Sequence, residues 1–186
     1  ELDFDLYTIE PIDLAGKAVR SSVIRHDLRM GDVCDAADLL GRAYHATGVV
    51  VEGDRRGRTI GVPTANMQTR NDKLLPADGV YATRTYIVPT GEHDEASMDA
   101  ATWQAYDSVS NLGVRPTVDG INRRLETHLL DFPRAGQSGD LYGATLRVEF
   151  FARLRGEQRF DGLDELLAQI QRDIAAARSI FETVNS

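Results

Sequence analysis

The sequence predicts a mainly β protein: an antiparallel barrel or sandwich followed by one long C-terminal helix. Between residues 44 and 154, five or six runs of alternating or β-branched and aromatic residues are separated by connections of hairpin length. From Asp164 onward, apolar residues recur at three- and four-residue steps, which is the period of an amphipathic helix. The 186 residues, 42% of them hydrophobic, are enough to bury a sizeable core in one domain.

The N-terminal region predicts helices rather than a sheet. After a short alternating strand at 4–10, a helix is expected to begin at Ser21 or Ser22, either of which could act as its N-cap. Gly31 should end that helix, and a second helix should run to Gly41.

The β-rich part then supplies the strands. Strands are expected at 47–51, 80–88, 103–112, 124–130 and 146–154. Gly113 and Pro116 are expected to end the third of these, and residues 89–101 form a polar hairpin excursion. The final helix should be capped by Asp161 or Asp164. Its apolar face is expected to carry Leu167, Ile170, Ile174, Ala177 and Phe181.

Composition excludes several classes of protein. A net charge of −8 argues against a protein that coats nucleic acid. No apolar run approaches the length of a membrane-spanning helix, so no membrane partner is expected. Cys34 is the single cysteine, which fits a reducing compartment and makes the cytoplasm the expected location. The four histidines are scattered and show no zinc or catalytic-triad spacing.

The run at 53–66 has the composition of an anion-binding loop. Three glycines at 53, 57 and 61 allow close backbone approach to phosphate oxygens, and the arginines between them can donate charge-assisted hydrogen bonds. Thr64 and Asn66 place two neutral oxygens on one face of an extended segment, where they could help hold a magnesium ion that substrate phosphates neutralise. A solvated basic hairpin loop is the alternative interpretation of the same residues.

Six separated strings resemble one known family, the riboflavin kinases, over roughly residues 41–182. They agree with the family's pattern in order and in spacing. The strings are GRTIGVPTAN at 57–66, LPADGVYA at 75–82, NLGVRPT at 111–117, LETHLLD at 125–131, DLYG at 140–143 and LRGEQRFD at 154–161.

This resemblance implies a six-stranded antiparallel Greek-key barrel with a C-terminal helix and a short helical N-terminal linker. It implies phosphorylation of the riboflavin 5′-hydroxyl by ATP to give FMN and ADP, with Mg²⁺ bound to the nucleotide. Glu126 matches the family's catalytic base, and Thr64 and Asn66 match its magnesium-facing pair. The remaining residues matched to nucleotide, flavin or site border are Gly57, Arg58, Gly61, Pro63, Asn111, Thr117 and Arg155.

The residues alone leave the role of Glu126 open. A carboxylate within hydrogen-bond reach of the ribityl hydroxyl could accept its proton during phosphoryl transfer. The alternative is an outward residue on an alternating strand, since its neighbour Leu125 and the pair at 129–130 indicate a core-facing side. Glu149 also lies on a strand, matches no motif and is expected to pair on the surface.

The N-terminal piece resembles the end of a different module. The string VRSSVIR at 19–25 is similar to the closing motif of the adenylyltransferase module in bacterial bifunctional FAD synthetases, although Arg20, Ser22 and Val23 depart from it. Residues 1–25 are therefore expected to be a remnant of that module, 26–43 a helical linker and 44–186 the kinase domain. Because the chain starts at Glu1 and the upstream nucleotide motif is absent, a fragment that does not itself make FAD is expected.

Two other functions fit the same residues. One is a flavin- or nucleotide-binding module without catalysis. The other is an interaction role, in which the strand at 4–10 docks an upstream domain or a second copy of the chain. The metal preference, the oligomeric state and the individual flavin contacts stay open at this point.

Overall fold

The computed structural model of the chain describes residues 7, 10, 12–14, 16–53, 57, 60–88, 103–117, 120–133 and 141–184. The predicted strand at 4–10 lies almost entirely outside these residues, and the predicted excursion at 89–101 lies wholly outside them. Among the described residues, no helix combines the length and the apolar character needed to cross a membrane.

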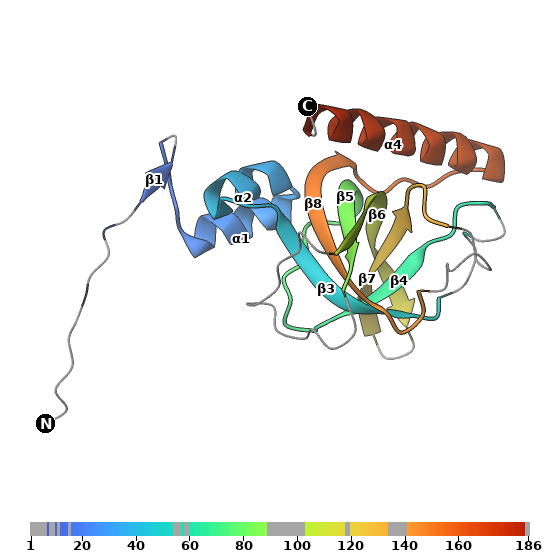
Figure 1. The fold of residues 1–186 in the computed structure, drawn as a ribbon, viewed down its shortest axis with the longest axis horizontal. Helices are drawn as coiled ribbons and strands as arrows, with labels where there is room; N and C mark the ends of the chain where they lie inside the picture. Colours follow the sequence, from blue (N-terminus) through green and yellow to red (C-terminus); the bar gives the residue numbers. More distant parts are fainter. Residues whose placement is uncertain are drawn as a thin grey trace, which may run out of the picture.

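Six antiparallel strands close into a barrel, as predicted (Figure 1). They are β3 (Tyr44–Val51), β4 (Ala65–Thr69), β5 (Gly79–Ile87), β6 (Gln104–Thr117), β7 (Gly120–Leu129) and β8 (Thr145–Arg155). Their order around the barrel is β3-β4-β7-β6-β5-β8. Within it, β8 returns to lie beside β5, the first of three consecutive strands, which is the arrangement of a Greek key.

Helices flank the barrel in two places (Figure 1). A small hairpin of β1 (Asp13–Leu14) and β2 (Lys17–Ala18) leads into α1 (Ser21–Met30) and α2 (Val33–Leu40). The long helix α4 (Leu163–Val184) lies across the outside of the barrel. Gly31 and Gly41 end α1 and α2 with left-handed backbone conformations, as predicted.

Several predicted boundaries were wrong: β3 and β7 begin three and four residues earlier than expected, and three other errors have a clear physical reason. The N-cap of α1 is Arg20, whose carbonyl accepts the first helical hydrogen bond from Ile24, so the serines are already inside the helix. At α4, Leu166 donates to the carbonyl of Gly162, so the predicted aspartate caps lie on either side of the capping position.

The third error concerns β6, which continues through Gly113 and Pro116 instead of ending there. Beyond Leu112 this strand pairs with β7 alone, because its pairing with β5 stops at that residue. A strand with one free edge tolerates the missing N–H of a proline.

The apolar core fills the barrel and includes the N-terminal helices. Leu28, Val33 and Ala36 belong to the same buried cluster as Tyr81 and Phe150 of the barrel. A smaller cluster lies outside the barrel wall, where Ala82 of β5 meets the C-terminal half of α4. The helix therefore covers an apolar patch on the outer face of the sheet.

Buried hydroxyl groups connect β5, β6 and β7 inside the barrel. The Thr83 hydroxyl hydrogen-bonds to those of Ser108 and Ser110 at 2.9 and 2.7 Å, and Ser110 hydrogen-bonds to Thr127. All four residues are fully buried. Because each polar group has a partner, this network helps to define the register of the three strands.

Candidate active site

A row of directly opposed residues crosses five strands of the barrel. Asn66 on β4 lies opposite Glu126 on β7, and Glu126 lies opposite Asn111 on β6. Asn111 is in turn opposite Val80 on β5, which is opposite Arg155 on β8. Since opposed residues of an antiparallel pair project from the same face, strands far apart in sequence bring these side chains to one side of the wall.

That side is the outer face of the barrel. Leu125 and Thr127, which flank Glu126, are 1% and 0% exposed. Side chains alternate along a strand, so Glu126 points away from the interior that its neighbours fill. The hydroxyl network fixes the inward residues, and the outward row is positioned as a consequence.

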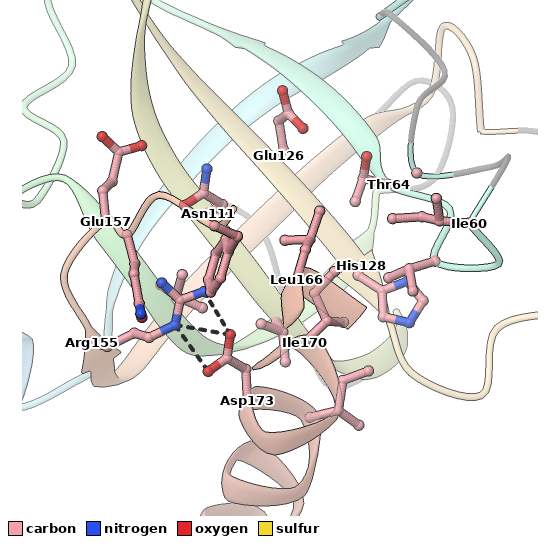
Figure 2. Close-up of a pocket in the computed structure, with 17 residues that line it drawn as sticks. Ile60, Thr64, Asn111, Glu126, His128, Arg155, Glu157, Leu166, Ile170 and Asp173 are labelled. Atoms are coloured by element: carbon pink, nitrogen blue, oxygen red, sulfur yellow. Dashed lines mark hydrogen bonds and ion pairs between the residues drawn. The ribbon is translucent and has the colours of Figure 1, made fainter. Parts of the chain in front are cut away.

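A cavity of about 320 Å³ lies between this outer wall and α4. Figure 2 shows Glu126 between Asn111 and Thr64, with Leu166 and Ile170 of α4 approaching from the helix side. The lining residues are Gly57, Ile60, Val62, Thr64, Val80, Val109, Asn111, Glu126, His128, Arg155, Glu157, Gln158, Phe160, Leu166, Ile170, Asp173 and Ile174. The lining therefore combines polar side chains with apolar ones.

The predicted loop closes one side of the cavity. The Val62 amide donates to the Gly57 carbonyl at 2.8 Å, which folds the loop back on itself. A Cβ at Gly57 would lie 2.3 Å from the Val62 carbonyl oxygen, so this close approach requires glycine. Thr64 follows and lines the cavity.

Asn66 lies beside Glu126 and is 7% exposed. Its Oδ1 is buried and has no hydrogen-bond partner among the described residues. A Cβ at Gly53 would come within 2.3–2.6 Å of the Asn66 amide group, so glycine leaves the space that this side chain occupies. An unsatisfied neutral oxygen next to Thr64 and Glu126 fits a hard divalent cation.

Arg155 is held at the other end of the row by α4. Its guanidinium makes a bidentate ion pair with Asp173, the closest contact being 2.9 Å (Figure 2). Gln169 donates to the same carboxylate at 2.8 Å. Asp173 is 5% exposed. The pair therefore connects β8 to the helix that covers the cavity.

His128 reaches the loop from β7. Its Nδ1 is 2.7 Å from the Pro63 carbonyl oxygen, and the ring also lines the cavity. No group of three or more histidine, cysteine, aspartate or glutamate side chains that could hold a metal is present among the described residues.

Comparison with known proteins identifies the family. The family model Flavokinase, described as riboflavin kinase, matches residues 40–181. The chain belongs to the riboflavin kinase family. A bifunctional riboflavin kinase/FMN adenylyltransferase of Escherichia coli (strain K12) is 39% identical over 181 residues, which cover 97% of this chain and 52% of that protein.

A second curated relative agrees with membership of the riboflavin kinase family, and a solved structure shares the fold. The protein of the same name from Bacillus subtilis (strain 168) is 35% identical, over 95% of this chain and 51% of its own length. A crystal structure described as a macrolide-efflux protein from Streptococcus pneumoniae superposes with a TM-score of 0.77 at 32% identity, covering 91% of this chain and 50% of that one. The chain thus spans about half the length of the curated relatives it matches.

The structure brings together most of the residues that the riboflavin kinase resemblance singled out. Gly57, Thr64, Asn111, Glu126 and Arg155 line one cavity. Asn66 adjoins them in the row, and Gly61 and Pro63 belong to the loop between Gly57 and Asn66.

Of the other two residues of the set, only the backbone position of Thr117 is described. Thr117 pairs with Gly120 at the tip of the β6–β7 hairpin, six residues and therefore roughly 20 Å along the strand from Asn111. Arg58 lies outside the described residues.

Sequence reasoning missed His128 and Asp173. His128 carried a usable signal, because it stands two residues after Glu126 on an alternating strand and so shares its face. Asp173 carried none, because it is one polar residue in an otherwise ordinary amphipathic helix.

Proposed function

We propose that the chain transfers the γ-phosphoryl group of ATP to the 5′-hydroxyl of riboflavin, which gives FMN and ADP. The observation that carries this proposal is the polar end of the cavity, where Glu126, Thr64 and Asn111 meet beside the buried Asn66 oxygen. Membership of the riboflavin kinase family supports the same reaction.

The apolar side chains that line the cavity suit a flavin ring. Its walls come from the outer face of the sheet and from α4, through side chains such as Val80, Val109, Leu166 and Ile170. A volume of about 320 Å³ is within the range of small-molecule sites. With the ring on these walls, the ribityl chain would extend toward Glu126.

Glu126 is the proposed base. Its carboxylate would accept the proton of the 5′-hydroxyl as that oxygen attacks the γ-phosphorus and the bond to the ADP oxygen breaks. Asn111, opposite Glu126 in register, would help to orient the reacting hydroxyl. Enclosure by α4 would exclude water that could otherwise accept the phosphoryl group.

Thr64 and Asn66 are the proposed protein ligands of a magnesium ion. The orphaned Asn66 Oδ1 and the space left by Gly53 support this assignment. When bound, the ion neutralises charge on the phosphates. The loop from Gly57 to Pro63 would contact the phosphates themselves.

The experiment is a pair of matched substitutions assayed with riboflavin, ATP and magnesium. Glu126→Gln should lower turnover about 10²-fold or more while riboflavin binding persists, because the amide cannot accept the proton. Glu182→Gln, at an exposed position in the last turn of α4 and outside the cavity, should keep wild-type turnover. Near-normal turnover in the Glu126 variant would contradict its role, and flavin binding without any FMN formation by the wild type would indicate a binding module.

We propose further that residues 1–25 come from the end of an adenylyltransferase module. The curated relatives carry both activities in their names and align with nearly the whole of this chain. A chain extended upstream in the manner of these relatives should convert FMN and ATP into FAD. The cytoplasm stays the proposed compartment, which the free thiol of Cys34 supports.

A further inference from the structure

The backbone ladder that holds the metal-facing loop stops one residue short of Thr64. β4 pairs with β7 over three positions, from Ala65 opposite Thr127 to Met67 opposite Leu125. Pro63 cannot extend this ladder as a donor, because proline has no N–H. Strand pairing between β4 and β7 therefore holds Asn66 and leaves the position of Thr64 to other contacts.

The His128 side chain supplies such a contact. Its Nδ1 lies 2.7 Å from the Pro63 carbonyl oxygen. A carbonyl oxygen only accepts hydrogen bonds, so Nδ1 must carry the proton and donate it. The contact thus defines which ring nitrogen is protonated, and it attaches the loop to β7 through the Pro63 carbonyl instead of through the N–H that proline lacks.

The hydrogen bond to Pro63 also restricts the position of Thr64, because a rigid peptide group joins the two residues. The Pro63 carbonyl and the Thr64 Cα belong to one planar peptide group, so fixing the carbonyl restricts where Thr64 lies. His128 and Glu126 are two residues apart on one face of β7. The same strand therefore carries the proposed base and the side chain that holds the proposed metal ligand beside it.

We propose that His128 is a positioning residue that fixes the Pro63–Thr64 peptide against β7 and so sets the metal–nucleotide side of the site. This inference rests on the proposed kinase function only for the identity of the ligand, Mg²⁺ with a nucleotide, that the loop binds. The hydrogen bond itself can be tested without any substrate.

The first test measures the protonated nitrogen directly. Long-range ¹⁵N–¹H NMR of the ¹⁵N-labelled chain, with the His128 signals assigned by their loss in His128→Asn, should show a proton on Nδ1. A bare Nδ1 would overturn the proposal, because it could not donate to Pro63. This measurement needs neither ATP nor riboflavin.

The second test uses isosteric variants and the binding of Mg²⁺–ADP by calorimetry. The amide nitrogen of asparagine occupies the position of Nδ1, whereas that of glutamine lies nearer Nε2. His128→Ala and His128→Gln should weaken Mg²⁺–ADP binding about 3- to 10-fold, the value of one neutral hydrogen bond, and His128→Asn should stay within about 2-fold of wild type.

Unfolding of each variant in urea checks that the chain remains folded, and riboflavin affinity should change less than nucleotide affinity. Equal weakening in all three variants, or in none, would overturn the positioning role. If the wild-type chain bound no Mg²⁺–ADP, the proposed function would fail, and the protonated nitrogen would still decide whether His128 holds Pro63.

Discussion

The glycines in the loop from Gly53 to Asn66 have two possible roles, close approach to bound phosphates or close approach to the protein itself. Glycine there predicted backbone approach to phosphates, yet two of the glycines approach the protein itself. Gly53 makes room for Asn66, and Gly57 lies against Val62. The sequence associated these residue types with a phosphate site, but the contacts that let the glycines shape the loop from within depend on its folded conformation.

Gly57→Ala should therefore impair nucleotide use. Its Cβ would meet the Val62 carbonyl oxygen at 2.3 Å, so the loop must shift and carry Thr64 with it. We expect the KM for ATP to rise about 10-fold or more, because small displacements in a site are costly. Gly162→Ala is the matched control, since nothing lies within 4 Å of its added Cβ. Equal kinetics in both variants would contradict this account of Gly57.

His45, away from the cavity, gives the barrel a sensitivity to acid. Burial, together with the cations Arg147, Lys73 and Arg42, lowers the pKa of His45 to about 3. An unfolded histidine titrates near pH 6.5. Between these values the unfolded chain binds a proton that the folded chain does not, so stability falls as the pH drops from about 6.5 toward 3.

His45→Gln should reduce this loss. Urea midpoints measured at pH 7.5 and pH 5.0 should differ less in His45→Gln than in the wild type. His26→Gln, at an exposed position of α1, should leave the wild-type difference intact. An unchanged difference in the His45 variant would show that other groups cause the acid sensitivity.

Among the elements, α4 performs two tasks with its two halves. Its C-terminal half packs on the barrel through Ala177 and Phe181, and its N-terminal half covers the cavity through Leu166 and Ile170. The apolar periodicity predicted the helix and its buried face. It could not distinguish residues that bury against protein from residues that border a cavity, because both are apolar at the same spacing.

The Arg155–Asp173 pair lies where the two halves meet, so it should matter for both stability and binding. Asp173→Asn leaves the partly buried guanidinium without its counter-charge and should lower the free energy of unfolding by about 3–5 kcal/mol. Riboflavin affinity should fall as well, because α4 loses its ion pair with β8 beside the cavity. Asp131→Asn removes the exposed ion pair with Arg178 and should lower the free energy of unfolding by at most about 1 kcal/mol. Similar losses in both variants would contradict the distinction between the pairs.

On the scale of the whole molecule, α1 and α2 are part of the barrel's core rather than a separate attachment. The Ala77 amide donates to the Leu28 carbonyl at 2.9 Å, and Arg153 of β8 donates to the carbonyls of Met30 and Asp78. The sequence predicted both helices and the barrel. Their joint packing depends on long-range contacts that no local pattern encodes.

Leu28→Ala tests this joint packing. Leu28 is 1% exposed in the barrel cluster, so truncation should lower the free energy of unfolding by about 2–5 kcal/mol in a single transition. Met30→Ala, at a residue 54% exposed, should change it by about 0.5 kcal/mol or less. A separate, early transition for the helices in circular dichroism would contradict a shared core.

The seam of the barrel also has a kinetic consequence. The seam is the pairing of β3 with β8, in which Tyr44 lies opposite Phe150. These strands come from opposite ends of the β-rich sequence, so the seam can form only after the strands between them have become compact. Loop-closure entropy opposes such early pairing, and folds of this kind take ~milliseconds to seconds to form. Because β8 and α4 leave the ribosome after the other strands of the barrel, a chain that is still being made lacks one wall of the cavity. A ligand would therefore stabilise only the completed barrel and favour it by mass action.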